Sequence, residues 1–364
     1  MKKVYHVPTD EMVEHWLSTT FVVSPAPNAD ELYQSVTPIK QPTLYYVPKS
    51  SELLFRSPHY AIDGIGILML WSEYLSALAS PKEVSFGDEP ARLAPVIEET
   101  LGYSGHTTKE QEERAAELFM SWAGSVPGIG PVSRLGSAPS GNSRSTEWVF
   151  PKEDTNEFIK ACKRHSITVT SAVQAAYIKA LAKYADPAFN QAQYVTVNQF
   201  NLRPYLPEPF NSPQYAASVY YTPHPYKLDM PSTFEDAAKS LNTHYQTSFK
   251  RNPGALELNG PFTRVVCGAV QTPEFQATPV SRDALFSSLG VVERYLQREY
   301  GSAVKVLDLK MGTDVVMGMC KLYAYTFQDQ LRLVYNFNDG FENPEDIRLY
   351  LEEVRNVLFE EMRA

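Results

Sequence analysis

His59 and Asp63 stand four residues apart, and Gly64 follows directly. An imidazole ordinarily has its pKa close to neutral pH, so a histidine in such a position can act as a general base. The apolar run 53–57 before the histidine favours a strand, and the apolar run 65–78 after the glycine favours a helix. The pattern predicts an imidazole at a strand end, with a carboxylate and a glycine completing a tight bend into a helix.

Other interpretations of the same residues compete with catalysis. His59 could be a structural residue whose ring nitrogens are satisfied. The spacing of His59 and Asp63 could hold a metal ion, but zinc needs at least a third protein ligand and no second His/Cys/Asp/Glu cluster stands out. Gly64 and Gly66 could begin a dinucleotide-binding loop, but Met69 occupies the third glycine position of that motif. We therefore expect neither a metal nor a bound dinucleotide here.

Length and composition describe a globular protein large enough for an extensive core. The chain has 364 residues, of which 43% are hydrophobic and 21% charged, which suits two domains or one large one. A net charge of -9 argues against broad nucleic-acid binding, because that requires a basic surface. No apolar run approaches the roughly 20 residues that span a membrane. We expect no membrane association and no partner nucleic acid.

The cysteines and the amino terminus bear on the compartment. Cys162, Cys267 and Cys320 are widely separated and odd in number, which argues against a disulfide framework. Each is expected to be a small buried apolar residue. The first residues are basic but lack the apolar stretch of a signal peptide. These features predict a cytoplasmic protein.

Helix and strand signals are mixed along the chain without strict alternation. Capping patterns predict helices that begin at Thr9, Thr108 and Ser232, and a final helix of roughly 18 residues opened by Pro344. The Gly/Ser/Pro-rich segment 124–145 is the best candidate for a linker or a mobile loop. Strands are predicted at 43–47, 146–150, 194–198, 218–221 and 304–309, with a hairpin of 315–327 and 331–337. This mixture favours α+β layers over a doubly wound sheet.

The strand, His-x-x-x-Asp-Gly, helix unit resembles the active-site motif of the chloramphenicol acetyltransferase-like superfamily, which includes condensation domains and plant-type alcohol acyltransferases. Trp16–Phe21 is most similar to the fungal trichothecene-type O-acetyltransferases within it. Other segments that resemble the superfamily, in the same order along the chain, are His165–Ala172, Asn201–Pro204, Ser287–Gly290 and Leu331–Asn338. The resemblance covers nearly the whole chain.

The sequence also departs from the superfamily. Pro58 replaces the first histidine of the double-histidine version, and the plant Asp-Phe-Gly-Trp-Gly signature is absent. Members of the superfamily usually carry another strand and helix ahead of the region where this chain begins. The start is therefore expected to be truncated, or the first lobe to be shortened at its N-terminus.

The resemblance implies an α+β fold of two lobes, with mixed β-sheets flanked by helices and a channel at the lobe interface. Residues 1–145 would form the N-terminal lobe with the motif, and residues 146–364 the C-terminal lobe. The catalytic residues would be His59 and Asp63, with His59 Nε2 as the general base. In the superfamily the aspartate holds the bend through an ion pair with an arginine, and Arg203 is the expected partner.

The resemblance also assigns substrate-binding residues. Gly64 would leave room for the backbone beside the substrate, and Ser287 and Ser288 are candidate donors to the oxyanion. The implied function is an acyltransferase of secondary metabolism. It would move an acyl group, in the first instance acetyl, from CoA or a carrier thioester to a hydroxyl or amine of a small natural product. Acetyl-CoA would be a co-substrate rather than a tightly bound cofactor, and a carrier protein could be a partner.

Two alternatives keep the same fold. The channel could promote cyclisation, as a cyclase or pericyclase acting on a polyketide or terpenoid without an acyl donor. The protein could also be a non-catalytic member that only binds a metabolite or a partner.

Overall fold

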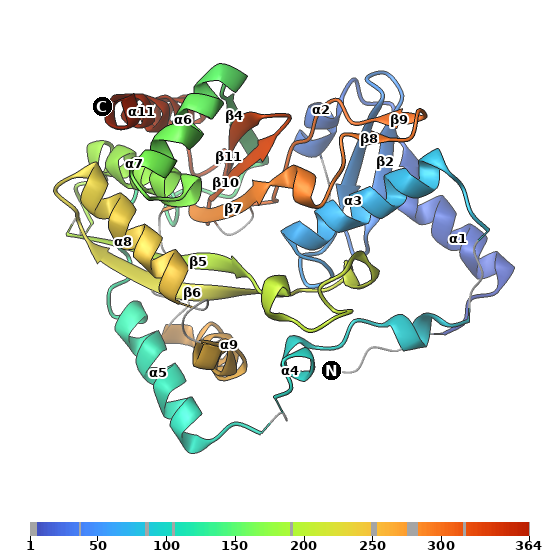
Figure 1. Ribbon diagram of the computed structural model, residues 1–364, viewed down its shortest axis with the longest axis horizontal. Helices are drawn as coiled ribbons and strands as arrows, with labels where there is room; N and C mark the ends of the chain where they lie inside the picture. The colour runs from blue at the N-terminus through green and yellow to red at the C-terminus, as the bar shows by residue number, and fades with distance from the viewer. Residues whose placement is uncertain are drawn as a thin grey trace. The chain divides into compact units, whose positions relative to one another are not determined.

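The computed structural model describes residues 6–35, 38–83, 87–103, 106–189, 192–248, 253–274, 283–315 and 318–363. They form two compact units, and Figure 1 shows their elements. Unit 1 comprises Met1–Gly102, Asn201–Tyr221 and Glu293–Leu307, and unit 2 comprises Tyr103–Phe200, Thr222–Val292 and Asp308–Ala364. Each unit is assembled from separate stretches of chain, and the lobe boundary at residue 145 stays a prediction.

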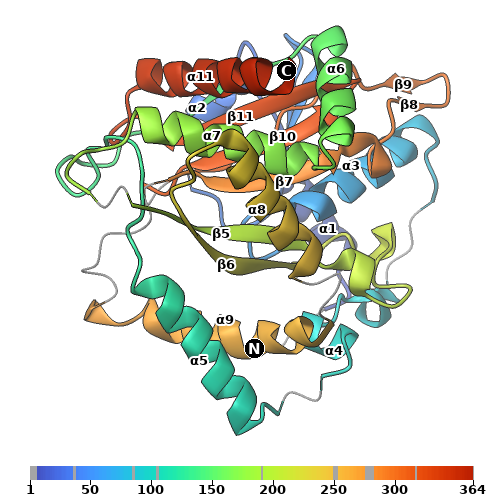
Figure 2. The same cartoon turned by 60° about the vertical axis from the view of Figure 1, so that its left-hand side comes forward.

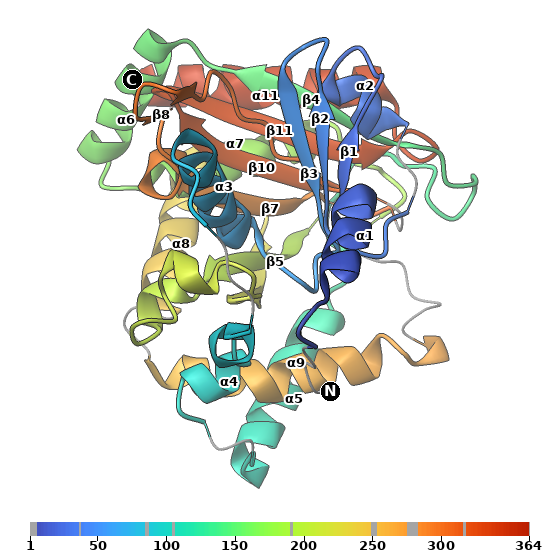
Figure 3. The same cartoon turned by 90° about the vertical axis from the view of Figure 1, so that its right-hand side faces the viewer.

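Unit 1 is built on a three-stranded sheet with the order β1-β2-β3, in which β1 runs parallel to β2 and β3 antiparallel to it. Its first elements are α1 (Asp10–Thr20), β1 (Phe21–Val23), α2 (Ala29–Gln34), β2 (Thr43–Val47), β3 (Glu52–Arg56) and α3 (Gly64–Ala79). Short elements follow: η1 (Glu89–Arg92), α4 (Ile97–Thr100), η2 (Arg203–Tyr205), η3 (Pro213–Tyr215), β8 (Glu299–Tyr300) and β9 (Val304–Lys305). Figure 3 shows α1 beside the three strands.

Unit 2 is built on a four-stranded sheet with the order β4-β11-β10-β7, in which β7 runs parallel to β10 and the other pairs are antiparallel. The elements of this layer are β4 (Ser143–Val149), α6 (Lys152–Arg164), α7 (Val169–Lys183), β7 (Leu285–Val291), β10 (Lys321–Phe327), β11 (Gln330–Asn338) and α11 (Pro344–Arg363). Helices α6, α7 and α11 cover one face of this sheet (Figure 2). The mixed sheet flanked by helices agrees with the predicted α+β class.

The remaining elements of unit 2 form further layers. They are α5 (Lys109–Ala123), β5 (Gln193–Asn201), β6 (Tyr221–Asp229), α8 (Phe234–Thr247), η4 (Pro253–Leu258) and α9 (Asn259–Ala269), while η5 (Val292–Arg294) leads back to unit 1. Strands β5 and β6 pair with each other, and α8 packs on α7. Helices α5 and α9 pack together through a small apolar cluster of Ala115, Phe119 and Phe262.

The core of unit 2 lies between its four-stranded sheet and the helices. Leu322 and Ala324 of β10 belong to this core. Because side chains alternate along a strand, Lys321 and Tyr323 face the opposite side of the sheet. Burial lowers the pKa of Lys321 to about 7.

The local helix signals are mostly confirmed. Thr9 and Thr108 cap α1 and α5, and the predicted capping box at Thr108 is present. The cap predicted at Ser232 is wrong by one residue, because the Thr233 hydroxyl accepts the hydrogen bond from the Asp236 N–H. None of the described helices is long and apolar enough to cross a membrane.

Three segments differ from their predictions. The predicted linker 124–145 lies inside unit 2, where the Ile129 N–H bonds the Gln193 carbonyl at 2.8 Å and the Ile129 side chain is buried. The strand predicted over 218–221 begins only at Tyr221, because the residues before it bond to Asp63 instead of to a strand: the Ser218 carbonyl accepts the Asp63 N–H at 3.1 Å, and the Tyr220 N–H donates to the Asp63 carboxylate at 2.7 Å. The first strand of the predicted hairpin begins at Lys321, and residues 316–317 lie outside the described residues.

Candidate active site

The bend after β3 has the predicted form. The chain leaves β3 at Arg56, turns through His59, and enters α3 at Gly64. The Ala61 N–H donates to the Pro58 carbonyl at 3.0 Å and closes the turn. Asp63 is the N-cap of α3, with extended backbone angles that let its carboxylate accept the Gly66 N–H at 2.7 Å.

The Asp63 carboxylate is buried, and both of its oxygens accept hydrogen bonds. Its Oδ1 also accepts from Arg203 Nη1 at 2.8 Å, and its Oδ2 accepts from Arg203 Nη1 and from the Tyr220 N–H, both at 2.7 Å. Both side chains of the ion pair are 3% exposed. A buried carboxylate needs such partners, because desolvation otherwise disfavours its charge. Asp63 therefore holds the bend and is not free to touch a substrate.

Arg203 ties this carboxylate to the segment between β5 and β6. Its Nη2 donates to the Ser218 hydroxyl at 3.0 Å, and Ser218 in turn donates to the Tyr215 carbonyl at 2.7 Å. The guanidinium also lies 5.4 Å from the centre of the Tyr220 ring. We refer to Asp63, Arg203, Ser218 and Tyr220 as the Asp63 cluster. The expected ion pair is thus a buried network and not a surface salt bridge.

The close backbone approach in this region is at Gly66, which the sequence interpretation did not assign. A Cβ on Gly66 would meet the Ala216 carbonyl oxygen, and Arg203 Nη2 would lie 3.1 Å away. Gly64 is the half-buried first residue of α3. The Gly-x-Gly spacing was the signal in the sequence that could have indicated this close packing. The predicted role of Gly64, leaving room for the backbone beside a substrate, stays a prediction.

The His59 ring is exposed, and it lies nearly parallel to the Tyr221 ring, with 5.4 Å between the centroids and 23° between the planes. Within the described residues, neither ring nitrogen of His59 has a hydrogen-bond partner. The hydrogen bonds of the Asp63 carboxylate go to Gly66, Arg203 and Tyr220, so among the described residues the two motif residues do not form a hydrogen-bonded dyad. This arrangement leaves the imidazole nitrogens available to exchange a proton with a ligand.

The two serines lie in unit 2, on β7, and point to opposite faces of the sheet. The Ser288 hydroxyl is hydrogen-bonded to the Thr170 hydroxyl at 2.8 Å, on the side covered by α7. Ser287 is 7% exposed and belongs to the other face, because neighbouring side chains alternate along a strand. The two hydroxyls therefore cannot serve one oxyanion together, and the assignment of either stays a prediction.

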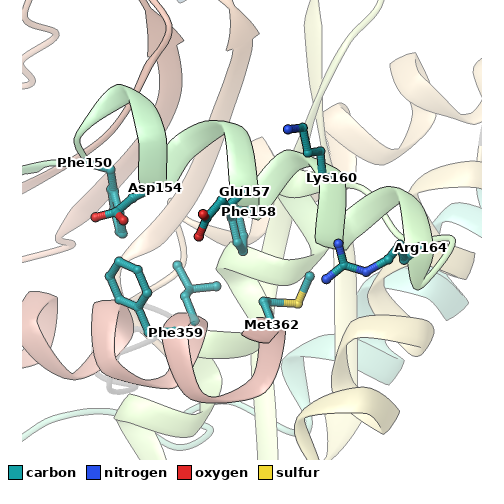
Figure 4. A pocket seen from close by; sticks show the side chains of 9 residues that line it. Phe150, Asp154, Glu157, Phe158, Lys160, Arg164, Phe359 and Met362 are labelled. Carbon is teal, nitrogen blue, oxygen red and sulfur yellow. The ribbon is translucent and has the colours of Figure 1, made fainter. Parts of the chain in front are cut away.

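A separate pocket of about 290 Å³ lies between α6 and α11 of unit 2 (Figure 4). Phe158, Phe359 and Met362 give it an apolar lining, with Lys160 and Arg164 along α6. None of the predicted site residues lines this pocket. Among the described residues, no three His, Cys, Asp or Glu side chains gather as ligands for a metal ion.

Several known proteins resemble this chain in sequence. The O-acetyltransferase pigM of Monascus ruber is 28% identical over 369 residues, covering 99% of this chain and 72% of pigM. The azaphilone biosynthesis cluster protein M of Aspergillus terreus is 28% identical over 298 residues, covering 78% of this chain and 70% of that protein. No protein-family model matches the sequence.

Solved structures of other proteins have a similar fold. The TRI3 trichothecene 15-O-acetyltransferase of Fusarium sporotrichioides superimposes with a TM-score of 0.80 over 97% of this chain and 79% of that chain, at 17% identity. This chain has the chloramphenicol acetyltransferase-like fold. The first condensation domain of the CDA synthetase has the same fold at a TM-score of 0.59 and 15% identity, over 93% of this chain and 74% of that one.

These findings confirm the predicted superfamily resemblance, the predicted chloramphenicol acetyltransferase-like fold and the prediction of an acyltransferase-type enzyme. The channel between lobes and the roles of individual residues stay predictions.

Proposed function

We propose that this protein is an acyltransferase of secondary metabolism that transfers an acetyl group from a thioester to a hydroxyl of a small natural product, with His59 as the general base. The observation that carries the proposal is the exposed His59 ring, whose nitrogens have no partner among the described residues. The names of the relatives, which include an O-acetyltransferase, support the reaction class.

The proposed reaction is a direct transfer. The acceptor oxygen forms a bond to the thioester carbonyl carbon while a ring nitrogen of His59 takes the hydroxyl proton. The tetrahedral oxyanion then collapses, the carbon–sulfur bond breaks, and the imidazolium returns the proton to the departing thiolate. The products are an ester and a free thiol. A general base contributes about 10²–10⁴-fold to such a reaction, and positioning supplies much of the remainder.

The other residues support this step without taking part in proton transfer. The Asp63 cluster fixes the bend that carries His59. Ser287 is the better of the two serine candidates for an oxyanion donor, because Ser288 is occupied by Thr170. The donor would be acetyl-CoA, with an acyl carrier protein as the other thioester source.

The names of two relatives support a proposal for the acceptor class. One relative bears the name of an azaphilone biosynthesis cluster, and one fold relative acts on a trichothecene. We therefore expect a hydroxylated polyketide or terpenoid as the acceptor.

The experiment compares the wild-type protein with His59→Ala, His59→Gln and the control His15→Ala. His15 is an exposed residue of α1 with no place in the site. Each protein is incubated with acetyl-CoA and a panel of hydroxylated polyketides and terpenoids. Free thiol and acetylated product are measured together. Wild type and His15→Ala should release equal amounts of both, while His59→Ala and His59→Gln lose about 10²–10⁴-fold in kcat/KM.

Other outcomes identify the alternatives. Turnover of a metabolite without any thioester, lost in both His59 variants, would support a cyclase. Binding of a metabolite that survives His59→Ala, with no turnover of any acceptor, would support a non-catalytic protein. Acyl transfer that survives both His59 substitutions would overturn the role of His59.

A further inference from the structure

The ring of Tyr221 lies against one face of the His59 imidazole. The ring centroids are 5.4 Å apart and the planes are within 23° of parallel. An offset, nearly parallel arrangement is one of the favourable geometries for aromatic pairs. His59 belongs to the turn after β3 and Tyr221 is the first residue of β6, so the contact joins two distant parts of the chain.

The backbone of Tyr221 is held by the same carboxylate that holds the bend after His59. The preceding residue, Tyr220, donates its N–H to Asp63 Oδ2 at 2.7 Å, and its carbonyl accepts the Leu202 N–H at 2.9 Å. Asp63 also caps the helix that follows His59. One carboxylate therefore fixes the chain on both sides of the ring pair.

The Tyr221 phenol stays protonated and neutral at working pH. Burial raises the pKa of Tyr221, and the nearby Asp63 carboxylate raises it further. A neutral ring can lie against the imidazole in both of its protonation states without introducing a competing charge.

We propose that Tyr221 is the positioning residue of the general base, holding the His59 ring in one plane and closing one of its faces to substrate. This inference rests on the proposed function. An exposed histidine samples several rotamers, and its terminal torsion is broad. A stacked partner removes most of that freedom, so the ring nitrogens point in a fixed direction before the acceptor arrives. Displacing a reacting group by about 1 Å costs on the order of 100-fold in rate.

The experiment uses Tyr221→Phe, Tyr221→Leu and the control Tyr60→Leu. Tyr60 follows His59 directly but is 80% exposed, and its hydroxyl contacts the Lys40 carbonyl at 3.5 Å instead of the His59 ring. Phenylalanine keeps the stacking face and leucine removes it. Thermal unfolding of each variant checks that the fold is intact.

Two readouts are taken. In the first, NMR of histidine-labelled protein without substrate follows the ring protons of His59, assigned by their absence in His59→Gln. Stacking shifts these protons upfield, and Tyr221→Leu should lose the shift while Tyr221→Phe and Tyr60→Leu retain it. In the second, acyl-transfer kinetics should show a kcat about 10-fold to 100-fold lower in Tyr221→Leu, and within about twofold of wild type in the other two.

Equal losses in Tyr221→Phe and Tyr221→Leu would overturn the proposal, because they would assign the effect to the hydroxyl. An unchanged kcat in Tyr221→Leu would also overturn it. If the NMR shift is lost in Tyr221→Leu but the wild-type protein acetylates no acceptor, the stacking is retained and the proposed function is overturned. The two failures are thereby distinguished.

Discussion

Asp63 accepts a hydrogen bond at 2.7 Å from the backbone N–H of Tyr220, which lies 157 residues further along the chain. The same carboxylate caps α3 and pairs with Arg203. This motif aspartate, four residues from the candidate base, thus holds the backbone that follows His59 and the backbone next to its stacked partner Tyr221. We expect its contribution to function to be geometric, and the variants below separate geometry from chemistry.

Breaking the ion pair should destabilise the protein strongly. Arg203→Met leaves the Asp63 carboxylate buried without its charge partner, and removing one member of a buried pair costs about 3–5 kcal/mol. Chemical denaturation measures the change. The control is Lys239→Met, which removes an exposed ion pair with Glu235 and should leave the unfolding midpoint unchanged. Similar midpoints for the two variants would show that the Asp63 cluster does not hold the bend.

A methyl group at Gly66 should not be accommodated. The added Cβ would meet the Ala216 carbonyl oxygen, and a backbone atom cannot rotate away as a side chain does. Gly66→Ala should therefore lower the free energy of unfolding by about 1–3 kcal/mol. Gly268 of α9 is a matched helical glycine with no atom within 4 Å of the added Cβ. Gly268→Ala should stabilise by about 0.5–1 kcal/mol, and a loss there as large as at Gly66 would contradict the steric argument.

Alanine substitutions of the two serines of β7 should have different effects, one on stability and the other on kcat. Ser288→Ala removes the hydroxyl bonded to Thr170 and should cost about 1 kcal/mol of stability, with little change in kcat. Ser287→Ala should leave stability nearly unchanged and, if its hydroxyl serves the oxyanion, lower kcat by about 10²–10³-fold. Denaturation curves and acyl-transfer kinetics on both variants provide the comparison. An unchanged kcat in Ser287→Ala would remove this residue from the mechanism.

Stability should fall in mild acid because of His244. Burial, with a smaller effect from His224, lowers the pKa of His244 to about 3. An unfolded histidine titrates near 6.5, so between these values the unfolded chain binds one more proton at this site than the folded chain. The contribution of His244 to the free energy of unfolding is therefore fully present above about pH 6.5 and declines as the pH falls towards 3. The contribution is on the order of a few kcal/mol.

His244 is surrounded by aromatic rings, so a substitution that keeps a ring at this position can test the pH dependence. His224, Tyr226 and Tyr245 face it, with centroids 5.3, 4.4 and 5.7 Å away. His244→Phe keeps an aromatic ring but cannot be protonated. The difference in unfolding free energy between about pH 7 and about pH 4.5 should shrink in this variant. His165→Ala, at an exposed position after α6, should keep the wild-type difference. Equal differences in all three proteins would exclude His244 as the cause.

Some features of the site could be predicted from sequence because they depend on residues that lie close together in the chain. Asp63 caps α3, and Thr108 forms its capping box, through hydrogen bonds to residues three positions away. Such bonds depend on residue types and spacing within one turn. The bend that carries His59 is of this kind. The cap at Thr233 was placed one residue early because Ser232 and Glu235 satisfy the same spacing as Thr233 and Asp236.

Contacts across long stretches of chain could not be predicted in the same way. The stacking of Tyr221 on His59 and the bond from Tyr220 to Asp63 depend on where the segment between β5 and β6 returns. No spacing rule connects residues 157 positions apart. The opposite orientation of Ser287 and Ser288, by contrast, follows from the period of a strand and could have been predicted once β7 was recognised.

The assembly of unit 1 from three separate stretches has a consequence for dissecting the protein. A fragment that stops at Gly102 carries His59 and Asp63 but lacks Arg203 and Tyr220, so its helix start contains a carboxylate with no charge partner. Proteolytic cleavage in the intervening chain need not separate these groups, since the pieces are joined by a buried network. The protein is therefore a natural candidate for fragment complementation, with restored pairing of Asp63 and Arg203 as the signal that the halves have reassociated.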